Sequence, residues 1–109
     1  MSRPWGEMAQ ALIDLERELR ALQVWTVEPP DARRLASGEP FCVDTLGFEE
    51  WLQWVFVPRM SDLIAQRGFL PRAAQLAPMG EQAFVHLGRR QRPLLLLLAR
   101  IDQLSRQLT

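Results

Sequence analysis

The sequence predicts an all-α protein, a four-helix bundle with a long ordered loop between its first and second helices. Three observations support this fold class. Apolar residues recur at helical spacing in four segments, no segment alternates convincingly as a half-buried strand would, and proline and glycine separate the segments. A chain of 109 residues is long enough for one core but too short for two, so we expect a single domain over residues 1–109.

The first predicted helix runs from residue 6 to about residue 25. Its apolar residues recur at alternating steps of four and three; they are Met8, Leu12, Leu15, Leu19 and Leu22. Glu16 and Arg20 are four residues apart, and we expect them to form a helix-surface ion pair. The helix should stop at Glu28-Pro29-Pro30, because the residue before a proline is pushed toward extended geometry.

Residues 29–47 are predicted to form a long irregular connection, because they contain three prolines and two glycines. One short helical turn is expected at residues 32–35. A connection of this length is unusual in a small domain unless it packs against the core, and Phe41, Val43 and Leu46 are available for that packing. We expect the second helix to begin within two residues of Gly47.

The second predicted helix is the most informative part of the sequence. Two tryptophans, a phenylalanine and a proline lie between residues 49 and 60, and apolar side chains almost encircle the helix. Such a helix either passes through the middle of a bundle or presents an aromatic face to a partner. Burial of one tryptophan is worth roughly 4 to 6 kcal/mol at most, so at least one of Trp51 and Trp54 should be in the core. Pro58 should bend the helix, and Gly68 should end it.

Two further helices are expected in the last third of the chain. The third should begin at Pro78 and end at Gly88. The fourth should begin near Pro93, with Leu94, Leu97, Leu98, Ile101, Leu104 and Leu108 on its apolar side. Its polar side should carry Arg100, Asp102, Gln103 and Arg106. The leucines of this helix can serve a core or a homodimer, and the sequence leaves that choice open.

The net charge is zero, but the charges are unevenly distributed. Residues 1–55 hold five arginines against ten acidic residues, and residues 56–109 hold eight arginines against three. Arg89, Arg90 and Arg92 form the densest basic cluster and are the candidate phosphate contact. An RNA-binding accessory that uses this cluster is therefore one alternative function.

No catalytic, cofactor or metal motif is visible. Cys42 is the only cysteine and is interpreted as a small buried residue, and His86 has no second ligand at metal-binding spacing. We therefore expect no cofactor, no metal and no enzymatic activity. The first residues lack the apolar stretch of a signal peptide, and the longest aliphatic run is far too short to span a bilayer. A cytoplasmic protein with no membrane contact is the expectation.

Four polar residues lie among large apolar ones around the second helix, namely Asp44, Glu50, Gln53 and Arg59. Arg59 would form a structural clasp if it folds back on Asp44 or on another carboxylate. The alternative is that these groups line a cleft with Trp54 and Met60, which would bind a small ligand or a peptide, or serve a small enzyme near Asp44, Glu50 and Arg59. Charged residues near a core usually pair internally, which favours the clasp.

Several motifs together resemble the YqcC-like family of small bacterial proteins. They are Pro40-Phe41, Asp44-Thr45, Glu50-Trp51-Leu52-Gln53-Trp54, Val57-Pro58-Arg59-Met60, Leu70-Pro71 and Ala77-Pro78-Met79. The resemblance covers most of the chain and implies a compact four-helix bundle of uncharacterised function. Members of this family are often labelled after a tRNA pseudouridine synthase, as neighbours or as parts of one chain.

That label does not imply synthase activity for these residues. Synthases of this kind have a large mixed α/β catalytic fold with an essential Asp in a short loop that contains Arg and Gly. Asp44-Thr45 lacks the neighbouring Arg and Gly and is interpreted as a helix cap. The resemblance therefore implies an accessory role beside such an enzyme.

The leading functional prediction is a non-enzymatic helical interaction module whose partner is another protein, for example a tRNA-modifying enzyme. Aromatic and methionine side chains are suitable anchors for such a contact, and Trp54, Phe56 and Met60 are its expected centre. The full candidate surface is Asp44, Glu50, Trp51, Trp54, Phe56, Arg59 and Met60.

Overall fold

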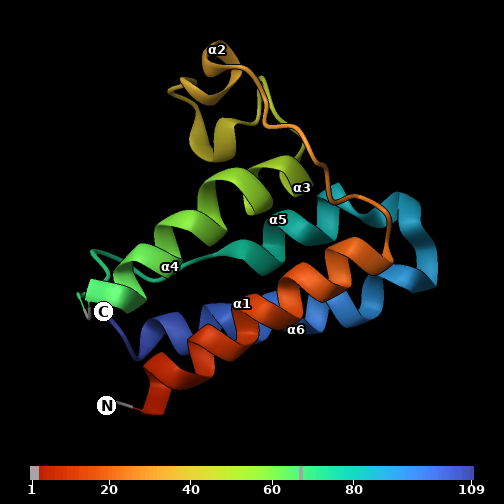
Figure 1. Ribbon diagram of the computed structural model, residues 1–109. Helices are drawn as coiled ribbons and strands as arrows, with labels where there is room; N and C mark the ends of the chain where they lie inside the picture. The colour runs from red at the N-terminus through yellow and green to blue at the C-terminus, as the bar shows by residue number, and fades with distance from the viewer. Residues whose placement is uncertain (1–2, 67) are drawn as a thin grey trace.

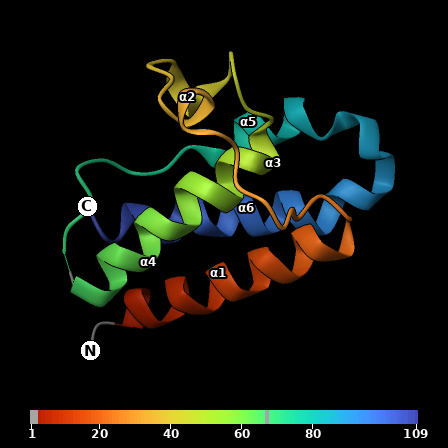
Figure 2. The ribbon, with the colours of Figure 1, turned by 45° about the horizontal axis from the view of Figure 1, so that its top comes forward.

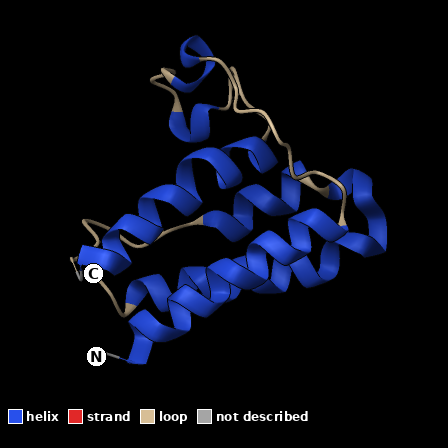
Figure 3. Cartoon of the chain, viewed as in Figure 1, coloured by secondary structure: helices blue, strands red, loops and turns tan. Residues whose placement is uncertain are grey.

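Four helical rods pack side by side, and each runs antiparallel to the one that follows it (Figures 1 and 2). The structure is a computed structural model, and it describes residues 3–66 and 68–109. The first rod is α1 (Arg3–Ala21), and the second combines α3 (Phe48–Trp51), a π-helical segment (Leu52–Phe56) and α4 (Val57–Gln66). The third is α5 (Leu76–Ala83), and the fourth is α6 (Arg92–Arg106). The residues drawn in Figure 3 as helix or loop include no strand, which confirms the all-α class.

The core lies between α1, α6 and α5, with the second rod packed across them (Figure 2). All five apolar residues predicted for the first helix are buried, and Glu16 pairs with Arg20 at 3.0 Å as expected. The predicted end at Glu28-Pro29-Pro30 is wrong, because α1 stops at Ala21. Gln23 adopts a left-handed backbone conformation (φ 63°), and the amide of Val24 donates back to the carbonyl of Leu19. The turn at Gln23 therefore ends the helix before the prolines are reached.

The loop between α1 and α3 stands out at one side of the bundle (Figure 1). Its predicted helical turn is α2 (Ala32–Leu35), and a short 3-10 turn, η1 (Pro40–Cys42), follows it. Leu46 is buried and Phe41 packs on the core as expected, but Val43 is 54% exposed and does not pin the loop.

The second rod begins where the sequence predicts, with Gly47 as the residue before α3. The carboxylate of Glu50 accepts a hydrogen bond from the amide of Gly47 at 3.0 Å, which satisfies one amide at the helix start. The interpretation of Asp44 and Thr45 as caps is wrong. Asp44 accepts a hydrogen bond from Ser37, and the hydroxyl of Thr45 donates to the carbonyl of Arg34 at 2.6 Å.

The irregularity expected at Pro58 lies just before it, in the π-helical segment. The amide of Val57 donates to the carbonyl of Leu52, five residues back, and Pro58 then lies in the first turn of α4. A proline is tolerated at that position because the wider turn has already interrupted the regular hydrogen-bond ladder. α4 ends at Gln66, and the amide of Gly68 donates to the carbonyl of Leu63 at 3.1 Å.

Three predictions for the third and fourth rods are wrong, namely the start of α5, the end of α5 and the exposure of Asp102. α5 begins at Leu76, two residues before Pro78, and it ends at Ala83 instead of Gly88. Gly88 has a positive φ of 59° inside the 3-10 segment η3 (Val85–Gln91) that joins α5 to α6. Asp102, which was assigned to the polar side of the fourth helix, is buried, and it accounts for the early start of α5.

The Asp102 carboxylate accepts hydrogen bonds from the amides of Leu76 and Ala77 at 2.7 and 2.9 Å. It therefore caps the N-terminus of α5 from a distant part of the chain. Ser105 supports the same junction, because its hydroxyl accepts from the amide of Ala74 at 2.8 Å and donates to the carbonyl of Asp102 at 2.6 Å. Within the described residues, no helix combines the length and the apolar character needed to cross a membrane.

Candidate functional site

A groove of about 620 Å³ lies between the second rod and the segment that joins α4 to α5. We call it the Trp51 groove. Its apolar surface is formed mainly by Trp51, Phe56, Met60, Leu63, Leu70 and Leu76, and Pro40 and Phe41 of η1 form one wall. Its polar groups are Arg59, Arg72 and Gln75. A mostly apolar groove with a few polar groups is typical of a binding site for a ligand or a peptide.

Aromatic packing fixes the position of the indole at the base of this groove. The ring of Trp51 stacks on Phe48 at 5.8 Å and meets the edge of Phe41 at 4.9 Å, and Phe56 lies 5.8 Å away on another side. Phe48 also contacts the fully buried ring of Phe84 in the core. Trp51 is therefore partly buried, and it packs against the core in a rigid cluster. The prediction that at least one of the two tryptophans lies in the core is wrong in that form, because Trp51 and Trp54 are both only half-buried.

The wall at Pro40 and Phe41 contains two residues in an unusual backbone conformation. Phe41 has φ 58° and Cys42 has φ 49°, a region that residues other than glycine seldom adopt. The burial of Cys42 and the hydrogen bonds of the turn hold this geometry, including Val43 amide to Pro40 carbonyl at 3.1 Å. Strained backbone of this kind is frequent at ligand-binding walls. Cys42 is the small buried residue that the sequence predicts.

A structural clasp exists, but Arg34 forms it and not Arg59. The guanidinium of Arg34 pairs with the carboxylate of Glu50 at 2.7 Å and donates to the carbonyl of Thr45 at 3.0 Å. The amide of Arg34 is itself bonded to the Asp31 side chain at 3.0 Å. The sequence contained one signal for this arrangement, since Asp31 begins a helical turn that carries an arginine three residues later.

The structure therefore separates the residues proposed for one surface. Trp51, Phe56, Arg59 and Met60 line the same groove, although Phe56 and Met60 are buried except where they face it. Asp44 and Glu50 are held by Ser37 and by Arg34, and they do not line the groove. Sequence reasoning missed Pro40, Phe41 and Leu63 as groove residues. It also missed the residues of the segment before α5, such as Leu70 and Arg72, because that segment has no helical period.

Trp54 belongs to a different hollow of about 370 Å³, which it lines with Trp25, Arg20 and Thr26. The indole N–H of Trp54 donates to the hydroxyl of Thr26 at 3.0 Å. The buried Gln53 side chain accepts from the amide of Thr26 at 2.9 Å and donates to its carbonyl at 2.6 Å. Gln53 therefore fastens the start of the loop to the second rod, and its role is structural.

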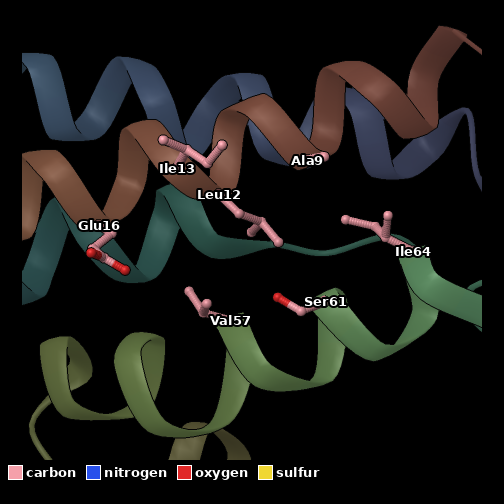
Figure 4. Close-up of a pocket in the computed structure, with 7 residues that line it drawn as sticks. All are labelled: Ala9, Leu12, Ile13, Glu16, Val57, Ser61 and Ile64. Atoms are coloured by element: carbon pink, nitrogen blue, oxygen red, sulfur yellow. The ribbon is translucent and has the colours of Figure 1, made fainter.

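Two other hollows are smaller. One of about 260 Å³ lies between α1 and α4, where Leu12 points from α1 toward Val57, Ser61 and Ile64 (Figure 4). The other, of about 350 Å³, is lined by Asp102, Arg106 and residues around the start of α5. Burial raises the pKa of the Asp102 carboxyl, and the hydrogen bonds from Ala77 and Leu76 and the charge of Arg106 offset part of that rise.

The basic cluster lies on a different part of the molecule from the groove. Arg89 and Arg90 are on η3 and Arg92 begins α6, and all three side chains are exposed, as is His86 nearby. This region lies at the end of the bundle that also contains the C-terminus of α1 (Figures 1 and 2). Among the described residues, no three His, Cys, Asp or Glu side chains are grouped as a metal site would require.

Comparison with known proteins gives a consistent family assignment. Residues 7–104 match the family DUF446, which is described as tRNA pseudouridine synthase C. An uncharacterised protein of Haemophilus influenzae is 39% identical over 94 residues, which cover 86% of this chain and 89% of that protein. The solution NMR structure of the protein YqcC from E. coli has a TM-score of 0.85 and 32% identity, covering 99% of this chain and 92% of that one.

A longer relative carries the synthase name itself. The tRNA pseudouridine synthase C of Pectobacterium carotovorum subsp. carotovorum is 48% identical over 73 residues, which are 67% of this chain. The same residues are only 19% of that protein. The match therefore spans about a fifth of the protein that bears the name.

Proposed function

This chain belongs to the DUF446 family, described as tRNA pseudouridine synthase C, and we propose that it is a non-enzymatic helical module that binds such a synthase through the Trp51 groove. Its relatives include a small uncharacterised protein and a much longer protein that carries the synthase name. The groove is the single observation that most supports an interaction role, because it is a mostly apolar hollow whose lining includes a rigid aromatic cluster.

The choice of partner rests on how the family is arranged in its relatives. The Pectobacterium protein contains this kind of sequence within a chain about five times as long as the match, whereas the Haemophilus protein consists almost entirely of it. Modules that occur within one chain in some organisms and alone in others commonly act together.

The absence of a catalytic role is supported by what the polar side chains already do. Glu50 and Arg34 close the loop, Asp102 caps α5, and Gln53 holds Thr26. Each of these partly or fully buried groups is engaged in a structural contact, and a general acid or base would have to be free to reach a substrate.

Binding of the purified synthase from the same cells tests this function, with calorimetry as the readout. Leu63→Glu puts a charge into the groove, and we expect it to weaken the complex at least about tenfold, since an unpaired charge would be desolvated there. Leu96→Glu is the matched control, because Leu96 is 73% exposed on α6 and outside the groove. Equal binding by the two variants, or no complex with the wild-type chain, would refute the proposal.

An RNA contact through Arg89, Arg90 and Arg92 is the second candidate function, and the joint exposure of the three side chains favours it. It requires tRNA binding that weakens steeply with salt, and replacement of all three by alanine should lower the slope of log K against log salt by about two to three. Arg33→Ala is the control, since this exposed arginine lies on α2. A salt slope that the triple variant does not change would eliminate this candidate.

A further inference from the structure

The charge of the Trp51 groove indicates the chemistry of its occupant. Of the described residues that line it, two are arginines and none is acidic. Both arginine side chains are exposed, and no described carboxylate lies within ion-pair distance of either. A groove with positive rims attracts a negatively charged partner and disfavours a positively charged one.

The two arginines come from two different elements that line the groove. Arg59 belongs to α4, whereas Arg72 belongs to the segment that joins α4 to α5, and the apolar base lies between these elements. The extended segment cannot easily move away, because the amides of Leu70, Ala74 and Leu76 are bonded to the last part of the chain at 3.1, 2.8 and 2.7 Å. The groove thus combines a fixed, mostly apolar lining with one arginine from each of these two elements.

This inference rests on the proposed function and names the chemistry of the partner at the same site. We propose that the Trp51 groove receives an amphipathic helical segment of the partner protein, whose apolar stripe lies over Trp51 and Leu63 and whose flanking carboxylates pair with Arg59 and Arg72. An amphipathic helix carries polar residues on both sides of its apolar stripe, so its carboxylates can reach arginines that two different elements contribute.

The test uses two model peptides of about 18 residues, long enough for measurable helix formation. Both carry leucine at helical spacing; one has glutamates on both sides of the stripe, and the other has lysines there. The intact protein should bind the glutamate peptide about tenfold more tightly than the lysine peptide at low salt, and high salt should reduce this preference. The joint change Arg59→Glu and Arg72→Glu should reverse it.

Controls separate charge at the groove from charge elsewhere. The joint change Arg89→Glu and Arg90→Glu alters net charge equally but lies outside the groove, so it should leave the preference intact. The joint change Arg59→Gln and Arg72→Gln removes both charges without reversal and should abolish the preference. Circular dichroism before each titration verifies that the variant is folded.

Equal binding of both peptides by the wild-type protein, or a preference that survives the reversal at Arg59 and Arg72, would overturn the inference. Self-association of the wild-type protein with no binding of either peptide would overturn it as well.

The outcomes distinguish this inference from the proposed function. If the synthase binds through Leu63 but is indifferent to charge at Arg59 and Arg72, the chemistry assigned to the occupant is wrong while the function stands. If the peptides show the expected preference and the synthase does not bind, the groove takes acidic helices and the proposed partner is wrong.

Discussion

Arg34 shows how a single side chain can connect parts of the chain that are distant in sequence. It bonds to the carbonyl of Thr45 and to the carboxylate of Glu50, so it ties α2 to the start of the second rod. The sequence predicts a clasp in this region but assigns it to Arg59, because Arg59 lies among large apolar residues near the expected bend of the second helix. Which arginine reaches which carboxylate depends on the path of the loop, and no local pattern encodes that path.

Replacement of Arg34 measures the contribution of this clasp. Arg34→Ala removes an ion pair and a hydrogen bond at a partly exposed site, where solvent weakens the ion pair. We therefore expect a loss of only about 1 kcal/mol in the free energy of unfolding. Urea denaturation gives this quantity. Arg33→Ala, the adjacent exposed arginine, should change it by less than about 0.5 kcal/mol. Equal losses in both variants would show that the clasp contributes nothing.

Asp102 makes stability depend on pH. Burial raises its pKa in the folded protein above the ordinary value of an aspartate carboxyl, so the folded state keeps a proton that the unfolded state has released. This contribution to stability is fully present below the unfolded pKa and is lost as pH rises through the folded pKa. Asp102→Asn cannot titrate and lacks it. The free energy of unfolding of the wild type minus that of Asp102→Asn should therefore fall as pH rises from about 4 and then level off. Urea denaturation across this pH range measures the difference, and one that grows with pH would contradict the raised pKa.

Periodicity predicts the helices well at the scale of elements, whereas their ends depend on contacts that periodicity does not contain. The buried face of α1, the short helix α2 and the start of α3 directly after Gly47 all agree with the sequence. The end of α1 depends on the left-handed Gln23, and the start of α5 depends on Asp102, which lies 26 residues away from Leu76. The π-helical segment before Pro58 is a third example, since its wide turn has no signature in the residues themselves.

The turn between α5 and α6 offers a prediction at this scale. Gly88 has φ 59° and ψ −135°, a combination that is essentially restricted to glycine, so Gly88→Ala should destabilise the fold by about 1 to 3 kcal/mol. Gly6→Ala is the matched control in α1, where nothing lies within 4 Å of an added methyl group, and it should stabilise by up to about 1 kcal/mol. Melting temperatures of the two variants should shift in opposite directions. A neutral Gly88→Ala would show that the turn adapts.

On the scale of the whole molecule, the structure shows where part of the excess positive charge of the second half of the chain lies. The second half of the chain is rich in arginine, and two of its arginines, Arg59 and Arg72, line the Trp51 groove from different elements. The sequence predicts the basic half and four of the groove residues, but it cannot predict that an extended segment with no period completes the site. It also groups Trp54 with Trp51, whereas the structure places the two indoles in separate hollows. Side chains on adjacent turns of one helix can face different neighbours, so the closeness of Trp51 and Trp54 in sequence does not place them in one site.

The indole N–H signals of Trp51 and Trp54 test the central claim most directly, since each tryptophan gives its own resonance in a nitrogen-labelled sample. Titration with the purified synthase should shift the Trp51 signal, together with the amides of Leu63 and Arg72, because these residues line the groove. The Trp54 signal should stay in place, because its indole donates to Thr26 in a separate hollow. Shifts confined to Trp54 or to the segment from Arg89 to Arg92, with Trp51 unchanged, would contradict the account.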